Sequence, residues 1–119
     1  MKSGWRVYKG KRYFFCDYSG FDLDFQSLKT EVNAVDDLIS KEPDDSVLTL
    51  IDFRNTVGTS EVVALFKQGA NRTRKNIHKN AILGITGVRK ILLDAVTRLT
   101  NQVAQTFDDE EKAKEWLVS

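Results

Sequence analysis

Two short apolar segments decide how this sequence folds: residues 46–52 (SVLTLID) and residues 80–86 (NAILGIT). Both are runs of branched and apolar side chains that end at a polar residue. Runs of this kind are typical of strands that are covered on both faces, as in a parallel sheet. We therefore expect both segments at the centre of a sheet.

The sequence before the first of these strands has the period of a helix. From Phe25 to Ile39 the apolar residues recur at intervals of three and four, and Pro43 follows. Asp22 or Asp24 supplies the side-chain oxygen that caps a helix N-terminus. We expect a helix that runs to about residue 41.

Many of the acidic residues fall within and around this expected helix. We interpret them as caps and a solvated helix face, not as a pair of carboxylates placed for acid–base catalysis. The acids concerned are Asp17, Asp22, Asp24, Asp36, Asp37, Glu42, Asp44 and Asp45.

Two more helices are predicted after residue 52. Thr59 and Ser60 are capping hydroxyls that precede an apolar period, so a second helix begins near Ser60 and ends in a basic stretch. Thr86 and Gly87 introduce a third helix, whose apolar residues between positions 88 and 103 mark one wide face.

Both ends of the chain add strands. Residues 5–8 and 12–18 are rich in aromatic and branched side chains and flank Gly10, which predicts a hairpin. Residues 105–107 predict a short edge strand, and residues 108–117 a last helix. The whole is a mixed α/β sheet of about five strands with four helices, in the order β-β-α-β-α-β-α-β-α, within a single domain over residues 1–119.

The composition excludes several classes of protein. A chain of 119 residues with one cysteine, one histidine and one methionine cannot build an internal disulfide, a thiolate site or a His-rich metal site. Cys16 lies in an apolar strand and His78 has no recognisable nucleophile beside it, so we expect no enzyme and no cofactor. Without a leader or an apolar run of about 18 residues, the expected location is the cytoplasm, with no transmembrane segment.

The carboxyl ends of the two central strands are the expected place for a ligand. Two helix N-termini, a glycine and nearby arginines suit a phosphate or a carboxylate, although these residues also fit ordinary structural turns. The candidate anion or partner site comprises Asp52, Arg54, Asn55, Thr56, Thr59, Ser60, Thr86, Gly87 and Arg89.

A basic run follows the second predicted helix. We interpret it as a solvated helix end, because cations complement the dipole there and no aromatic residues are interleaved for stacking on bases. Nucleic acid is therefore not an expected partner. The run comprises Lys67, Arg72, Arg74, Lys75, His78 and Lys79.

In its order of elements the chain resembles STAS domains. In its sequence segments it is similar to the SpoIIAA-like group, which is related to the CRAL-TRIO lipid-transfer proteins. Four segments carry the resemblance: YKGKRYFFCDYSG (8–20), EPDDSVLTLIDFRNT (42–56), AILGITGVRKILLDAV (81–96) and FDDEEKAKEWL (107–117). The resemblance implies a small bacterial or archaeal protein whose fold serves protein partners and sometimes nucleotides or lipids.

One segment departs from the STAS pattern. Anti-sigma-factor antagonists carry an Asp-Ser-Ser-Gly sequence with a phosphorylated serine before the second helix, whereas residues 52–62 here read DFRNTVGTSEV. Thr59 and Ser60 are neighbours of the phosphorylated position, and Glu61 could mimic a permanent negative charge. The alternative is that both hydroxyls only cap the helix.

Two functions remain open from the sequence. The first is a non-enzymatic STAS-like interaction or regulatory module, with the start of the second helix and its loops as the contact surface. The alternative is a small carrier of a lipid or another apolar ligand with an anionic head group, which needs an apolar pocket of about 300 Å³ or more.

Leu93 and Val96 give the third helix a second apolar side. This side is either a homodimer interface or part of the covered core.

Overall fold

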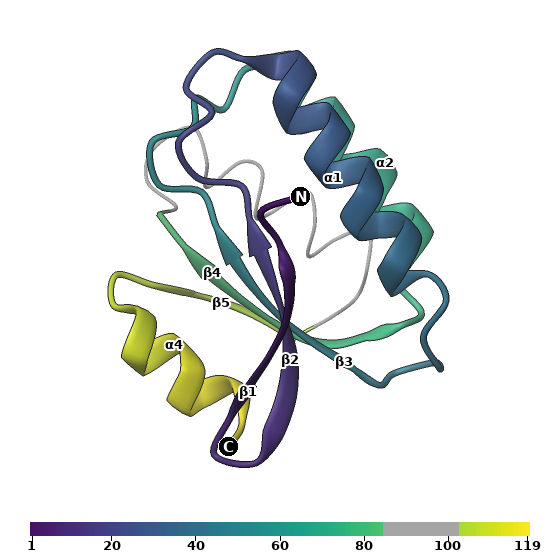
Figure 1. Cartoon of the computed structure of the whole chain (residues 1–119), viewed down its shortest axis with the longest axis vertical. Coiled ribbons are helices and arrows are strands. Elements are labelled where there is room, and N and C mark those ends of the chain that lie inside the picture. Colours follow the sequence, from purple (N-terminus) through teal and green to yellow (C-terminus); the bar gives the residue numbers. More distant parts are fainter. Residues whose placement is uncertain (85–102) are drawn as a thin grey trace.

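The computed structural model describes residues 1–84 and 103–119. Within these ranges the chain forms five strands and three helices (Figure 1). The elements are β1 (Gly4–Tyr8), β2 (Lys11–Asp17), α1 (Phe25–Ile39), β3 (Val47–Asp52), α2 (Ser60–Thr73), β4 (Ile77–Leu83), β5 (Val103–Phe107) and α4 (Glu110–Leu117). The helix predicted after Thr86 lies outside the described residues.

The strands form one sheet in the order β1-β2-β3-β4-β5. β1 and β2 are antiparallel, and every later pair is parallel. β3 is therefore the central strand, which confirms the prediction for residues 46–52. Figure 1 shows α1 and α2 side by side over one face of the sheet and α4 on the opposite face.

Each face of the sheet has its own core because alternate side chains of a strand point to opposite faces. Phe14 and Cys16 of β2 pack with the helices α1 and α2. Their neighbours Phe15 and Tyr13 pack with Ala113 and Leu117 on the other side, against α4. The sequence predicted a two-sided burial for β3, and both cores include residues of that strand.

Local signals account for the ends of most elements. The turn between β1 and β2 places Lys9 and Gly10 at positive φ, the conformation that favours a two-residue hairpin turn. Asp24 caps α1 by accepting a hydrogen bond from the backbone N–H of Ser27, and Thr59 caps α2 by accepting one from that of Val62. Both caps were predicted.

The predicted first residue of the second central strand was wrong. We expected residues 80–86, but β4 comprises Ile77–Leu83, and Gly84 follows with φ of +80°. Ile77 pairs with Val47, and a register irregularity after Val47 brings Lys79 opposite Leu48. The polar side chains of His78 and Lys79 hid this part of the strand from the hydrophobic pattern.

Candidate functional site

The loops that follow β2 and β3 lie side by side at the carboxyl edge of the sheet. The backbone N–H of Gly20 donates to the carbonyl of Arg54 at 2.9 Å, and that of Asp22 donates to the carbonyl of Asn55 at 3.0 Å. The N–H of Val57 donates back to the carbonyl of Asp22 at 3.0 Å. These bonds join the two loops into one platform in front of α1 and α2.

The side chain of Thr56 links the two loops of this platform through hydrogen bonds. Its buried hydroxyl donates to the carbonyl of Tyr18 at 2.5 Å and accepts from the N–H of Phe21 at 3.2 Å. Thr56 also forms an isolated parallel bridge with Asp22. Thr56 was predicted as a binding residue, and the structure places it inside the loop platform.

Asp52 and Arg54 are turned toward α4. The guanidinium of Arg54 donates to both carboxylate oxygens of Asp52, at 3.0 and 2.8 Å, and lies 3.8 Å from Glu110 on α4. The hydrogen bond with Asp52 raises the pKa of Arg54. The positive charge that the sequence analysis assigned to an anion is thus balanced by two carboxylates of the chain itself.

The loop after β4 comes very close to Arg54. A Cβ atom at Gly84 would lie 2.8 Å from the backbone nitrogen of Arg54, so only glycine fits at this point. The carboxyl ends of β3 and β4 are therefore neighbours, as expected. Thr86, Gly87 and Arg89, the rest of the predicted anion site, lie outside the described residues, as do Leu93 and Val96 of the predicted interface.

A groove opens between the N-terminal halves of α1 and α2. One hollow of about 230 Å³ is lined by residues of the loop platform and the first turns of both helices. A second hollow of about 250 Å³ continues between the helices, and both are lined by Phe25 and Glu61. We call these two hollows the α1–α2 groove. Thr59 and Ser60 lie on its wall.

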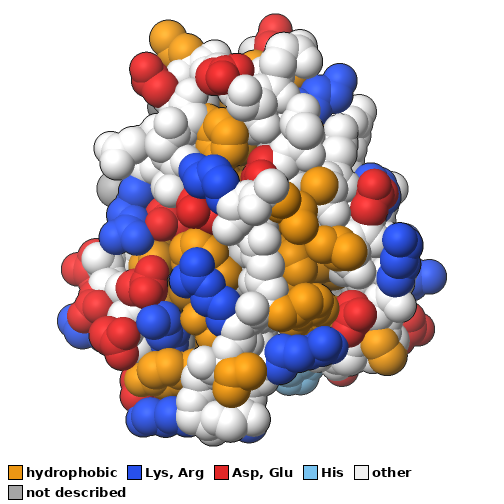
Figure 2. Space-filling view, viewed as in Figure 1, with side chains coloured by type: hydrophobic (Ala, Val, Ile, Leu, Met, Phe, Trp, Pro, Cys, Tyr) orange, Lys and Arg blue, Asp and Glu red, His pale blue; other side chains and the backbone are white. Residues whose placement is uncertain are grey.

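The α1–α2 groove combines exposed apolar side chains with acidic ones. Leu23 is 70% exposed and Val57 is 41% exposed. The acids on the groove wall are Asp22, Asp24 and Glu61, against one lysine, Lys29. Figure 2 shows acidic and hydrophobic side chains together at the end of the molecule where α1 begins.

Only part of this groove was predicted from the sequence. Thr59, Ser60 and Glu61 were candidate residues, but Asp22 and Asp24 were interpreted only as caps, and Leu23 was not among the candidates. Asp24 does cap α1, and its hydrogen bonds with Ser27 lower its pKa, so the carboxylate stays charged at the groove. In the sequence, the signal that could have identified this surface was a leucine between two aspartates, directly before the helix.

A second cavity lies deeper, between α1, α2 and the sheet. Its volume is about 50 Å³, well below the roughly 300 Å³ at which ligand pockets begin. Cys16 lies on its floor and is buried, as predicted, and burial raises the pKa of its thiol. The size of this cavity does not favour the carrier of a lipid.

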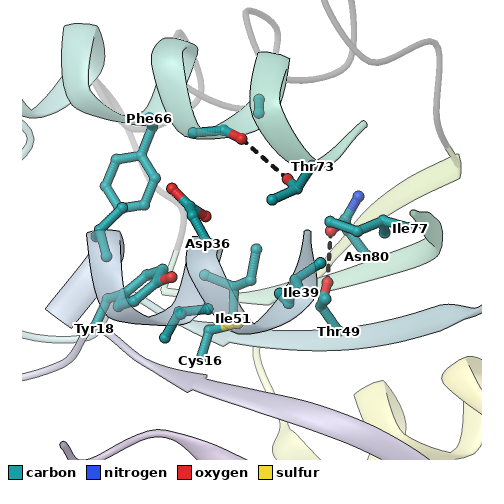
Figure 3. Close-up of a pocket in the computed structure, with 14 residues that line it drawn as sticks. Cys16, Tyr18, Asp36, Ile39, Thr49, Ile51, Phe66, Thr73, Ile77 and Asn80 are labelled. Atoms are coloured by element: carbon teal, nitrogen blue, oxygen red, sulfur yellow. Dashed lines mark hydrogen bonds between the residues drawn. The ribbon is translucent and has the colours of Figure 1, made fainter. Parts of the chain in front are cut away.

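The cavity also contains an acid that the sequence analysis placed wrongly. We expected Asp36 on a solvated helix face, but Asp36 is only 7% exposed and lines the cavity (Figure 3). Asp36 follows Val32 by four residues and precedes Ile39 by three, which places it on the buried stripe of α1. This spacing was the available signal.

The basic run is divided between two elements. Arg72, on the last turn of α2, pairs with Asp37. His78 and Lys79 belong to β4: Nδ1 of His78 lies 3.0 Å from Asp45, and Nζ of Lys79 donates to the carbonyl of Trp116 at 3.1 Å. The expectation of a solvated helix end is therefore wrong for His78 and Lys79.

Within residues 1–84 and 103–119, no group of three or more His, Cys, Asp or Glu side chains is placed to hold a metal ion. None of the helices described in these ranges has the length and apolar character needed to cross a membrane.

The comparison with solved structures agrees with the geometry of the sheet. No protein-family model and no curated protein matches the chain. The crystal structure of an uncharacterized protein from the DUF3478 family of Shewanella loihica PV-4, which has a SpoIIAA-like fold, is similar with a TM-score of 0.62 and 16% sequence identity. The match covers 97% of this chain and 91% of that one. The chain thus has a SpoIIAA-like fold, as the sequence resemblance implied.

Proposed function

We propose that residues 1–119 form a single, non-enzymatic STAS-like module that binds a protein partner through the α1–α2 groove. The observation that carries this proposal is the exposure of Leu23 and Val57 on a hydrogen-bonded loop platform beside three acids. Exposed apolar side chains gathered on one surface mark interaction sites.

The charges of the groove define the chemistry of the partner. Asp22, Asp24 and Glu61 outnumber Lys29, so the groove attracts cations and repels acidic surfaces. The partner presents an apolar side chain that covers Leu23 and Val57, flanked by lysine or arginine. Glu61 occupies the region where the resemblance would place a switched phosphate, and it supplies a constant negative charge there.

Two features support a binding role over a chemical one. The thiol of Cys16 is buried and its pKa is raised, so it is protonated and shielded from substrates. The charged side chains of Asp52 and Arg54 are joined to each other and directed toward α4. The groove, in contrast, presents its apolar and acidic side chains to solvent.

Selection from a peptide library tests this proposal directly. A phage library of random short peptides is selected on the wild-type protein, and the enriched peptides are titrated against Leu23→Asp. Val7→Asp is the matched control, because Val7 is also 70% exposed but lies on β1.

We expect enriched peptides with apolar residues flanked by lysine or arginine. Their affinity falls about tenfold or more in Leu23→Asp, because a central apolar contact contributes more than about 1.4 kcal/mol. Val7→Asp binds like the wild type. Peptides that bind Leu23→Asp as tightly as the wild type would overturn the assignment of the groove.

A further inference from the structure

Asp36 lies where a charge is unfavourable, in the interface between α1 and α2. Figure 3 shows its carboxyl group pointing into the cavity between the two helices and the sheet, near Phe66, Tyr18 and Thr73. The cavity wall is mostly apolar, with Val32, Val35 and Ile39 from the same helix. A buried carboxylate in such surroundings needs hydrogen bonds or a counter-charge to be stable.

Within the described part of the chain, neither carboxylate oxygen of Asp36 has a hydrogen bond or an ion pair. Arg72 is close enough to lower the pKa of Asp36, but its guanidinium binds Asp37 instead. Thr73 uses its hydroxyl within α2, where it donates to the carbonyl of Gly69 at 3.0 Å. Asp36 is thus a buried acid that lacks the partners its ionised form requires.

Glu31, which precedes Asp36 on the same helix, is the opposite case. Both acids are 7% exposed. The carboxylate of Glu31 accepts hydrogen bonds from the backbone N–H groups of Lys2 and Ser3, at 3.2 and 2.8 Å. These two hydrogen bonds give the buried carboxylate of Glu31 its partners, and nothing comparable is present at Asp36 among the described residues.

Gly69 brings α2 close to the carboxyl group of Asp36. A Cβ atom at position 69 would overlap with Oδ2 of Asp36 and lie 3.1 Å from its Cγ. The two helices are therefore in direct contact at this point. Gly69 and Asp36 both line the cavity, whose volume of about 50 Å³ exceeds the roughly 10–15 Å³ that one water molecule needs.

The charged and titratable groups around Asp36 do not remove this conflict. Burial raises the pKa of Asp36 to about 7, Arg72 lowers it and Asp37 raises it further. Burial raises the pKa values of Cys16 and Tyr18, on the β2 side of the cavity, and the nearby Asp36 raises them further, so both groups are neutral. Asp36 is therefore expected to titrate between its protonated and ionised forms in the neutral pH range.

We propose that Asp36 is a pH-sensitive latch between α1 and α2. When it is protonated, the helices pack closely against Gly69. When it is ionised, water enters the cavity and the α1–α2 interface loosens. Because the same helices form the walls of the α1–α2 groove, the latch regulates access to that groove, and this consequence rests on the proposed function.

The direct test is the carboxyl carbon resonance of Asp36 in the wild-type protein, followed by NMR between pH 3 and pH 9. We expect a midpoint near the value of about 7 that burial produces. A midpoint near the ordinary value of 3.8 would overturn the proposal. This measurement requires no variant and no partner.

The coupling to the helices is tested with Asp36→Asn and a control, Asp44→Asn. Asp44 is an exposed acid in the loop that follows α1. The folded protein holds the Asp36 proton where the unfolded chain has lost it, so stability falls as pH rises from about 4 to about 7.

We expect the unfolding constant of the wild type, relative to Asp36→Asn, to rise by up to about tenfold per pH unit in this range. Asp44→Asn keeps the pH dependence of the wild type. Above pH 7, amide hydrogen exchange in α1 and α2 is expected to be faster in the wild type than in Asp36→Asn at the same pH. Parallel stability curves for wild type and Asp36→Asn would overturn the latch.

The two proposals fail separately. If Asp36 titrates near neutral pH but the selected peptides ignore Leu23→Asp, the latch stands and the groove assignment is wrong. If the peptides require Leu23 but Asp36 titrates near 3.8, the groove assignment stands and the latch is wrong.

Discussion

The layer formed by α1 and α2 has two sides with opposite relations between charge and solvent. On the outer side, the acids Asp22, Asp24 and Glu61 surround exposed apolar side chains. On the inner side, apolar side chains surround a single acid, Asp36. The outer acids are exposed to water, whereas the inner acid is enclosed by apolar side chains, where it either keeps its proton or opens the interface. We infer that the outer side serves recognition and the inner side controls stability.

A substitution of Phe66 tests the inner side with the largest expected effect. Phe66 packs on Phe53 and Tyr18, with ring centroids 4.7 and 5.3 Å away. Phe66→Ala enlarges the cavity and is expected to destabilise the protein by about 3–5 kcal/mol. Urea denaturation measures this loss. A loss below about 1 kcal/mol would mean that this interface is not a packed core.

The close contact at Gly69 predicts an intermediate effect. Gly69→Ala pushes the new methyl group into Asp36, and overpacking of this kind costs about 1–3 kcal/mol. In the Asp36→Ala background the methyl group finds space, so the second substitution is expected to cost less there. A double-mutant cycle of denaturation free energies measures the coupling. Simple additivity would show that the two residues do not meet.

The comparison between Glu31 and Asp36 predicts opposite effects on stability when either carboxylate is removed at pH 7.5. Glu31→Ala leaves the N–H groups of Lys2 and Ser3 without an acceptor and is expected to cost about 1–3 kcal/mol. Asp36→Asn removes an unsolvated charge and stabilises the protein at this pH. Denaturation of both variants in one buffer checks the pair. A loss at both positions would contradict the distinction between them.

The smallest effect on stability is expected on the outer side. Leu23 is exposed in the folded protein, so Leu23→Asp changes the free energy of unfolding by less than about 0.5 kcal/mol. Thermal unfolding measured beside the peptide titrations checks this. A large loss of stability would show that Leu23 supports the loop platform and that its effect on binding is indirect.

The sequence was sufficient for the sheet and the caps because these depend on local patterns. Residues 46–52 are apolar on both faces, which predicted β3 at the centre, and Asp24 and Thr59 have the residue types that cap helices. The pattern failed at Ile77, because His78 and Lys79 interrupt the apolar run at the start of β4.

The features of the site depend on contacts between distant segments, and a pattern in sequence does not contain them. Asp36 has the same residue type as its exposed neighbour Asp37, and its burial follows only from the packing of α1 on α2 at Gly69. Likewise, Leu23 and Val57 become one surface only because the backbones of their loops are hydrogen-bonded. Arg54 looked available for an anion, and its partner Glu110 comes from the other end of the chain.

The most direct test of the central claim is the dissociation constant of one selected peptide for wild type, Leu23→Asp and Val7→Asp, measured by isothermal titration calorimetry in the same buffer. We predict a loss of about tenfold or more in Leu23→Asp and no change in Val7→Asp. Equal affinity for all three proteins would contradict the assignment of the α1–α2 groove as the binding surface.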